Sequence, residues 1–110
     1  GRVASMIVDT EPCLGCICLG YPFHPVSKPN KLRTEHLRHI NSPVLILQGT
    51  RDPFGTIEEV KRYELSQHVQ VQYLRNGDHS FNTRKKDNES TAELMEEAIT
   101  ASSQFIKRTL

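Results

Sequence analysis

An aspartate and a histidine are the residues of this chain whose types and spacing could do chemistry. Asp52 lies in a turn after the apolar run at 44–47, and His79 lies in a turn after the run at 69–74. A histidine can take a proton from a nucleophile and return it to a leaving group, while a carboxylate orients the imidazole and stabilises its cation. Each residue alone also has an ordinary reading, as a turn aspartate or a partly buried loop histidine. Their order and matching contexts favour a catalytic acid and base.

The sequence shows no evident nucleophile for this pair. The elbow pattern Gly-x-Ser-x-Gly, which presents a serine on a sharp turn between a strand and a helix, does not occur in the 110 residues. Ser80 directly follows His79, and Ser5 lies in a segment predicted to be helical, so neither is a convincing replacement. Asp78 competes with Asp52 as the acid, but neighbours on a turn rarely aim their side chains at each other. We interpret Asp78 as a turn residue.

The elements that would position the pair alternate between strands and helices. The unbroken apolar run at 44–47 is typical of a strand covered on both faces of a parallel sheet. Ligands of such sheets gather at the carboxyl ends of the strands, where Asp52 and His79 fall. The fold class is therefore α/β, with about three parallel strands and flanking helices as one half of a three-layer sandwich. Strands are predicted at 14–19, 44–47 and 69–74, and helices at 2–8, 33–40, 57–66 and 91–109.

Two helices carry specific signals. Thr56 can cap the helix at 57–66, with Glu59 as its capping-box partner. The last helix has an apolar stripe at helical spacing, which we expect to face the sheet. That stripe consists of Leu94, Met95, Ala98, Ser102, Phe105 and Ile106.

Three segments resemble one protein family. They are 19–25 (LGYPFHP), 48–55 (QGTRDPFG) and 77–81 (GDHSF). They are similar to the dienelactone-hydrolase-like branch of the α/β-hydrolase superfamily, and within it to bacterial predicted hydrolases related to regulatory subunits of histone-acetyltransferase complexes. The resemblance covers the whole chain but only the C-terminal half of the family domain. It implies that residues 1–110 are the C-terminal portion of a single domain, and that the elbow serine lies roughly three residues before Gly1.

The resemblance also implies a function. The parent domain would be a serine hydrolase acting on ester, thioester or similar acyl bonds, with Asp52 and His79 as the acid and histidine of its triad. The upstream segment would supply the serine and the backbone donors that hold the oxyanion, so this chain alone would be inactive. The alternative is a non-catalytic scaffold or interaction module, because this fold does not guarantee hydrolysis.

Aromatic residues follow the first predicted strand. Tyr21, Phe23 and His24 lie just past its carboxyl end, so they could line a substrate pocket. They could equally pack a loop that its prolines keep ordered. The sequence leaves these two alternatives open.

Cys13, Cys16 and Cys18 form a C-x-x-C-x-C pattern, and His24 could supply a fourth zinc ligand. However, a strand places Cys16 and Cys18 on one face and Cys13 on the other. Buried thiols are the favoured reading, so we predict no metal. With no glycine-rich phosphate loop in the sequence, we predict no cofactor either.

Composition limits the partners. The formal net charge of +1 does not indicate nucleic-acid binding. The basic cluster at 84–86 is followed by Asp87 and Glu89, whose charges weaken its attraction for phosphate. We expect Arg51 to form a surface salt bridge. No apolar stretch approaches the about 20 residues that span a bilayer, so no membrane is predicted. The expected partners are a small acyl substrate and either a second copy of the chain or the missing N-terminal half, and the resemblance implies a cytoplasmic location.

Overall fold

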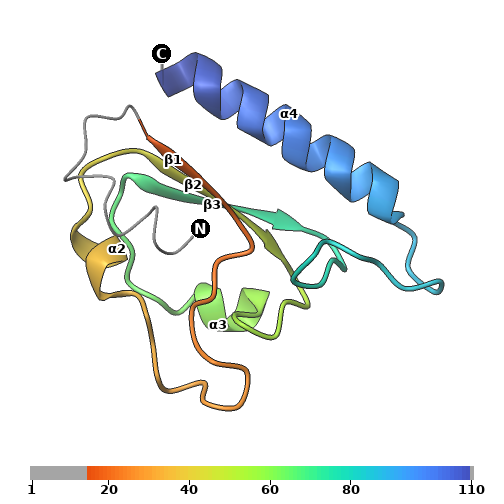
Figure 1. Ribbon diagram of the computed structural model, residues 1–110, viewed down its shortest axis with the longest axis horizontal. Coiled ribbons are helices and arrows are strands. Elements are labelled where there is room, and N and C mark those ends of the chain that lie inside the picture. The colour runs from red at the N-terminus through yellow and green to blue at the C-terminus, as the bar shows by residue number, and fades with distance from the viewer. Residues whose placement is uncertain (1–14, 110) are drawn as a thin grey trace.

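The computed structural model describes residues 15–109, in which three strands form one parallel sheet in the order β1-β2-β3 (Figure 1). This confirms the α/β fold class and the three predicted strands. The predicted helix at 2–8 lies outside the described residues. The elements are β1 (Cys16–Leu19), α2 (Glu35–His39), β2 (Val44–Gly49), α3 (Ile57–Val60), β3 (Val69–Leu74) and α4 (Thr91–Thr109).

Strand β2 lies in the middle of this sheet, and all six of its residues are buried. Because side chains alternate along a strand, it contributes to two separate hydrophobic clusters. Val44 and Ile46 pack with residues of the α2 and α3 side, whereas Leu45 and Leu47 pack with α4. Figure 1 shows α2 and α3 on one side of the sheet and α4 on the other. The three layers follow from the unbroken apolar run that the sequence shows.

Helix α3 begins with the predicted capping box. The Thr56 hydroxyl accepts from the Glu59 N–H, and Glu59 Oε1 accepts from the Thr56 N–H at 3.0 Å. The predicted end at residue 66 is wrong, because the helix ends at Val60. The reason is tertiary. Ser66 donates from its N–H to Leu37 O at 2.8 Å and from its hydroxyl to Ile40 O at 2.6 Å, so the chain turns toward α2 instead of continuing the helix.

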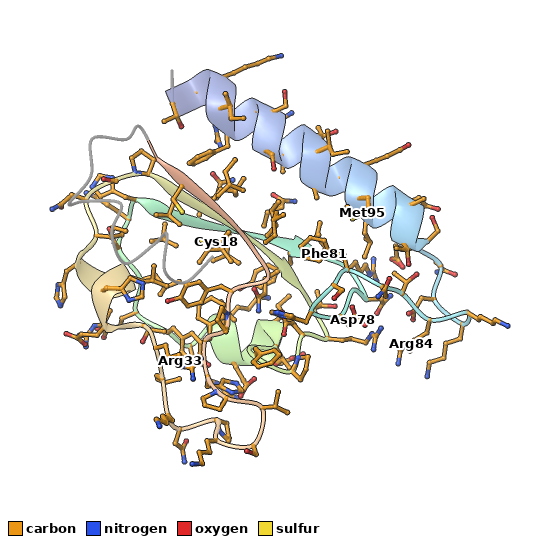
Figure 2. The ribbon with its side chains drawn as sticks, in the orientation of Figure 1. Cys18, Arg33, Asp78, Phe81, Arg84 and Met95 are labelled. Carbon is orange, nitrogen blue, oxygen red and sulfur yellow. The ribbon has the colours of Figure 1, made fainter. Side chains whose placement is uncertain are left out.

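Helix α4 has the predicted bounds, but only part of its predicted stripe faces the sheet. Leu94, Ala98 and Phe105 are buried, whereas Met95 and Ile106 are about half exposed. These exposed side chains and Ile99 border an apolar groove together with Leu19 of β1 and Phe81. Figure 2 shows Met95 on α4 and Phe81 beneath it. Among the described helices, none is both long and apolar enough to cross a membrane.

Candidate active site

The turn after β2 buries the carboxylate of Asp52 completely. Asp52 N–H donates to Gly49 O, and Gly55 N–H donates to Asp52 O, both at 3.1 Å. One side-chain oxygen, Oδ1, accepts from the Phe54 N–H at 2.9 Å, as in an Asx-type turn. The turn role that the sequence suggested for Asp52 therefore occupies Oδ1 and leaves Oδ2 for other partners.

His79 is the partner of that second oxygen. Its Nδ1 lies 2.7 Å from Asp52 Oδ2, so the two strand-end side chains are hydrogen-bonded to each other. Asp52 is fully buried while the His79 side chain is 39% exposed. With the proton on Nδ1 donated to the carboxylate, the neutral imidazole carries its lone pair on Nε2. Within residues 15–109, no hydrogen bond reaches Nε2.

Two close contacts hold the imidazole in place. The ring centroids of Phe54 and His79 lie 4.6 Å apart at an interplanar angle of 50°. Gly20, at the end of β1, lies against the same histidine, because a Cβ placed there would come within 2.8 Å of His79 O and 3.1 Å of Cε1. The ends of all three strands therefore meet at His79.

The turn that carries His79 is built by side chains bonded to its backbone. Asp78 Oδ1 accepts from the N–H groups of Ser80 and Asn82, both at 2.9 Å, so Asp78 is the turn residue that the sequence suggested. Arg51 differs from its prediction. Among residues 15–109 its guanidinium forms no salt bridge but donates to Asn76 O at 2.8 Å and to Asn82 O at 3.2 Å. Arg51 thus bridges both ends of the His79 turn from its position beside Asp52.

The three residues for which the sequence left pocket lining and loop packing open lie in the interior. Tyr21 and Phe23 are fully buried in the cluster beneath α2 and α3, with ring centroids 4.7 Å apart. The Tyr21 hydroxyl donates to Arg33 O at 2.8 Å, which ties both ends of the loop together. His24 is only 2% exposed. The structure therefore favours packing, the second of the two alternatives, for all three side chains.

The buried imidazole of His24 pairs with the carboxylate of Glu59, whose side chain is 29% exposed. Its Nδ1 faces Pro25 O at 2.7 Å and its Nε2 faces Glu59 Oε1 at 3.0 Å, so both ring nitrogens point at acceptors. Burial acts to lower the pKa of His24, but the bonds to the Pro25 carbonyl and to Glu59 together raise it above its ordinary value. The Thr56 N–H, and then His24, lower the pKa of Glu59 against the opposing effect of burial. The pair fastens the loop after β1 to α3.

The cysteine pair lies on one face of β1, as the strand reading requires. Cys16 Sγ and Cys18 Sγ are 3.7 Å apart, and burial raises the pKa of the Cys18 thiol to about 12. Cys13 lies outside the described residues. Within 15–109 no group of three or more histidine, cysteine, aspartate or glutamate side chains could hold a metal ion.

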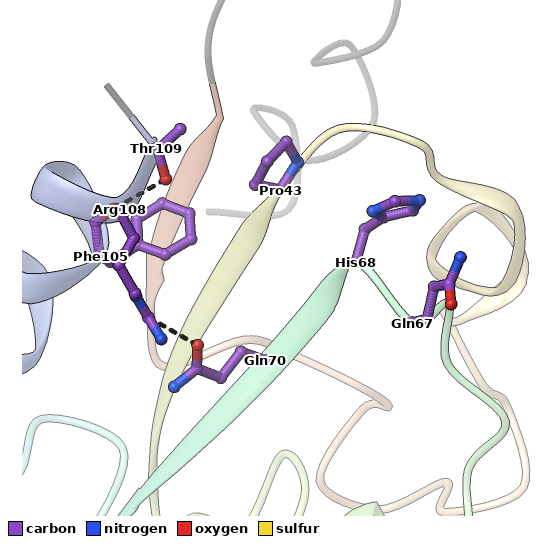
Figure 3. A pocket seen from close by; sticks show the side chains of 7 residues that line it. All are labelled: Pro43, Gln67, His68, Gln70, Phe105, Arg108 and Thr109. Carbon is purple, nitrogen blue, oxygen red and sulfur yellow. Dashed lines mark hydrogen bonds between the residues drawn. The ribbon is translucent and has the colours of Figure 1, made fainter.

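A separate pocket lies at the opposite ends of the strands (Figure 3). Pro43 and His68 border it just before β2 and β3, whereas Asp52 and His79 follow those strands. Arg108 Nη2 donates to Gln70 Oε1 at 2.8 Å across this pocket and fastens α4 to β3. We assign this pocket no part in the chemistry of the acid and histidine.

Sequence reasoning missed three residues that hold the pair. They are Gly20, Gln48 and Arg51. Gln48 left a signal, since it is a polar residue at the end of an otherwise apolar strand. The other two act through contacts between segments far apart in the sequence, which no local pattern records.

Comparison with known families agrees with this geometry. A family model described as an alpha/beta hydrolase domain matches residues 1–107. The chain belongs to the α/β-hydrolase family. In that fold an acidic residue and then a histidine follow the nucleophile along the chain.

Proposed function

We propose that this chain carries the acid and the base of a serine hydrolase that cleaves ester, thioester or similar acyl bonds. The observation that carries the proposal is the 2.7 Å hydrogen bond between a fully buried Asp52 carboxylate and a partly open His79 imidazole. A buried carboxylate on one ring nitrogen and an accessible second nitrogen are what a general base of this class requires.

The proton path follows from this arrangement. His79 donates Nδ1–H to Asp52, so Nε2 accepts the proton of the attacking hydroxyl. The resulting imidazolium returns that proton to the leaving alcohol or thiol, and Asp52 stabilises the cation in between. Phe54 and Gly20 limit the tilt of the ring, which keeps Nε2 aimed at one position.

We infer that a serine outside the 110 residues supplies the nucleophile. Two observations support this: the sequence has no Gly-x-Ser-x-Gly elbow, and no hydroxyl or thiol within 15–109 is hydrogen-bonded to His79 Nε2. The segment bearing the serine would also provide the oxyanion donors. The resemblance of residues 19–25, 48–55 and 77–81 supports a place in the dienelactone-hydrolase-like branch. The same resemblance is our basis for proposing a cytoplasmic location.

Hydrolysis of short-chain nitrophenyl esters tests the function. We expect no turnover by the 110-residue chain and turnover by a version extended upstream through the elbow. In the extended version His79→Ala should abolish hydrolysis, and Asp52→Asn should lower kcat by about 10⁴-fold because an amide facing Nδ1 favours the tautomer that carries its proton on Nε2. A folded extended chain that is inactive on all acyl substrates would instead favour an interaction module. Hydrolysis by the 110-residue chain that depends on His79 would place the nucleophile within it.

A further inference from the structure

The side-chain amide of Gln48 is hydrogen-bonded inside the protein through both its oxygen and its nitrogen. Gln48 lies near the end of β2 and is fully buried. Its Oε1 accepts from the Tyr21 N–H at 2.8 Å. Its Nε2 lies 3.2 Å from Tyr21 O, 3.1 Å from Asp52 Oδ2 and 3.0 Å from Gly55 O. Exchanging the amide oxygen and nitrogen would set an oxygen against three acceptors, so the network itself determines the orientation.

This network bears directly on the direction of the Asp52 carboxylate. The Phe54 N–H holds Oδ1 from within the turn, at 2.9 Å. With that hydrogen bond alone, the carboxylate could still rotate about its Cβ–Cγ bond. Gln48 supplies a second donor, 3.1 Å from Oδ2, which is the oxygen that also receives His79 Nδ1. With donors on both oxygens, Oδ2 stays pointed at the imidazole.

We propose that Gln48 is a positioning residue that aims Asp52 at His79. This role rests on the proposed function, since it matters only if the pair acts as acid and base. The same amide holds both backbone groups of Tyr21, so it also ties the loop leaving β1 to the acid. A buried amide with a purely structural role would stabilise the fold equally but would leave the His79 hydrogen bond unchanged when removed.

Two substitutions separate these roles. Gln48→Met approximates the volume and removes every hydrogen bond of the amide. Gln48→Glu keeps Oε1 for the Tyr21 N–H and replaces only the donor, which brings a second carboxylate to Asp52. Ile46→Val is the matched control, because it removes one buried methylene from the same strand and costs about 1 kcal/mol without touching the pair.

The measurement is ¹H and ¹⁵N NMR of the His79 ring in the 110-residue chain. We expect the unsubstituted chain and Ile46→Val to show the same downfield Nδ1–H resonance. In both Gln48 variants this resonance should move upfield and broaden by exchange with water. Unchanged His79 resonances in a folded Gln48 variant would overturn the proposal. Failure of both variants to fold would also overturn it, by making Gln48 a structural residue alone.

This readout is independent of hydrolysis. NMR of the imidazole needs neither a nucleophile nor a substrate, so an inactive extended chain would refute the hydrolase proposal and leave the Gln48 result standing. In an active extended chain, the Gln48 variants should lower kcat by about 10- to 100-fold with little change in KM, because only the orientation of the base is disturbed.

Discussion

Gly20 and His79 lie far apart in the sequence, yet the backbone of the glycine lies against the histidine. Gly20 has a φ of +72°, and a Cβ there would lie 2.8 Å from His79 O and 3.2 Å from Nδ1. Position 20 therefore requires glycine, because its φ is positive and because a side chain there would meet His79. The end of β1 forms part of the wall of the candidate site.

Substitution of this glycine should damage fold and site together. We expect Gly20→Ala to lower the free energy of unfolding by about 2 kcal/mol, through left-handed strain and the contact with His79 O. The His79 Nδ1–H resonance should shift as well. Gly77→Ala is the comparison, since its new Cβ would meet Leu94 Cδ1 at 2.8 Å and Phe81 Cα at 3.3 Å but its φ is not positive, so it reports the cost of a close contact without left-handed strain. Urea unfolding with wild-type stability and an unmoved resonance in Gly20→Ala would refute this contact.

Arg51 should control the order of the His79 turn. Arg51→Met removes the bonds to Asn76 O and Asn82 O, and we expect a loss of about 1 kcal/mol together with faster amide exchange across 76–82. Arg38→Met removes only exposed ion pairs with Glu35 and Glu64, so it should change stability little. Equal exchange rates in the two variants would show that Arg51 does not brace the turn.

The His24–Glu59 pair should make stability depend on pH. The raised pKa of His24 contributes stability that is complete below its ordinary value of 6.5 and is lost as pH rises through the folded value. The lowered pKa of Glu59 contributes stability above its ordinary value of 4.5, which is lost as pH falls through the folded value. The pair is therefore most stabilising between these two ordinary values. Asp52 also bears on the titration, because its charge raises the pKa of His24.

Glu59→Gln tests this dependence with little other change, because glutamine can keep the capping box with Thr56. We expect it to be about 1 kcal/mol less stable than the parent near pH 5.5, with the gap closing as pH rises above the folded pKa of His24. Urea titrations from pH 4 to 9 measure the gap. A constant gap across this range would mean that His24 carries no extra proton in the fold.

The apolar groove beside α4 should cause self-association of the isolated chain. Ile99 and Leu19 are 65% and 62% exposed and border the same groove, and apolar patches of this kind promote contact between molecules. We propose that the unsubstituted 110-residue chain sediments as a dimer or larger species at micromolar concentration. Ile99→Lys should shift it toward monomer. Val26→Lys, on a separate loop and 55% exposed, should not. If the unsubstituted 110-residue chain sediments as a monomer, this expectation is contradicted.

The pairing of Asp52 with His79 could be predicted from the sequence. Asp52 and His79 follow strands whose patterns are local, and parallel strands bring such ends together. The contacts that hold them could not be predicted, because they join distant segments: Gln48 to Tyr21, and Gly20 to His79. The length of α3 was overestimated for the same reason, since the bonds of Ser66 to α2 outweigh the helical pattern.

Covalent labelling with a fluorophosphonate tests the assignment of Asp52 and His79 as acid and base most directly. The chain extended upstream is treated with the reagent, and the labelled residue is located by mass spectrometry. We expect one serine outside the 110 residues to be labelled, and we expect His79→Ala to slow labelling by about 10⁴-fold or more. Labelling at full rate in His79→Ala, or on a residue within the 110, would contradict the assignment.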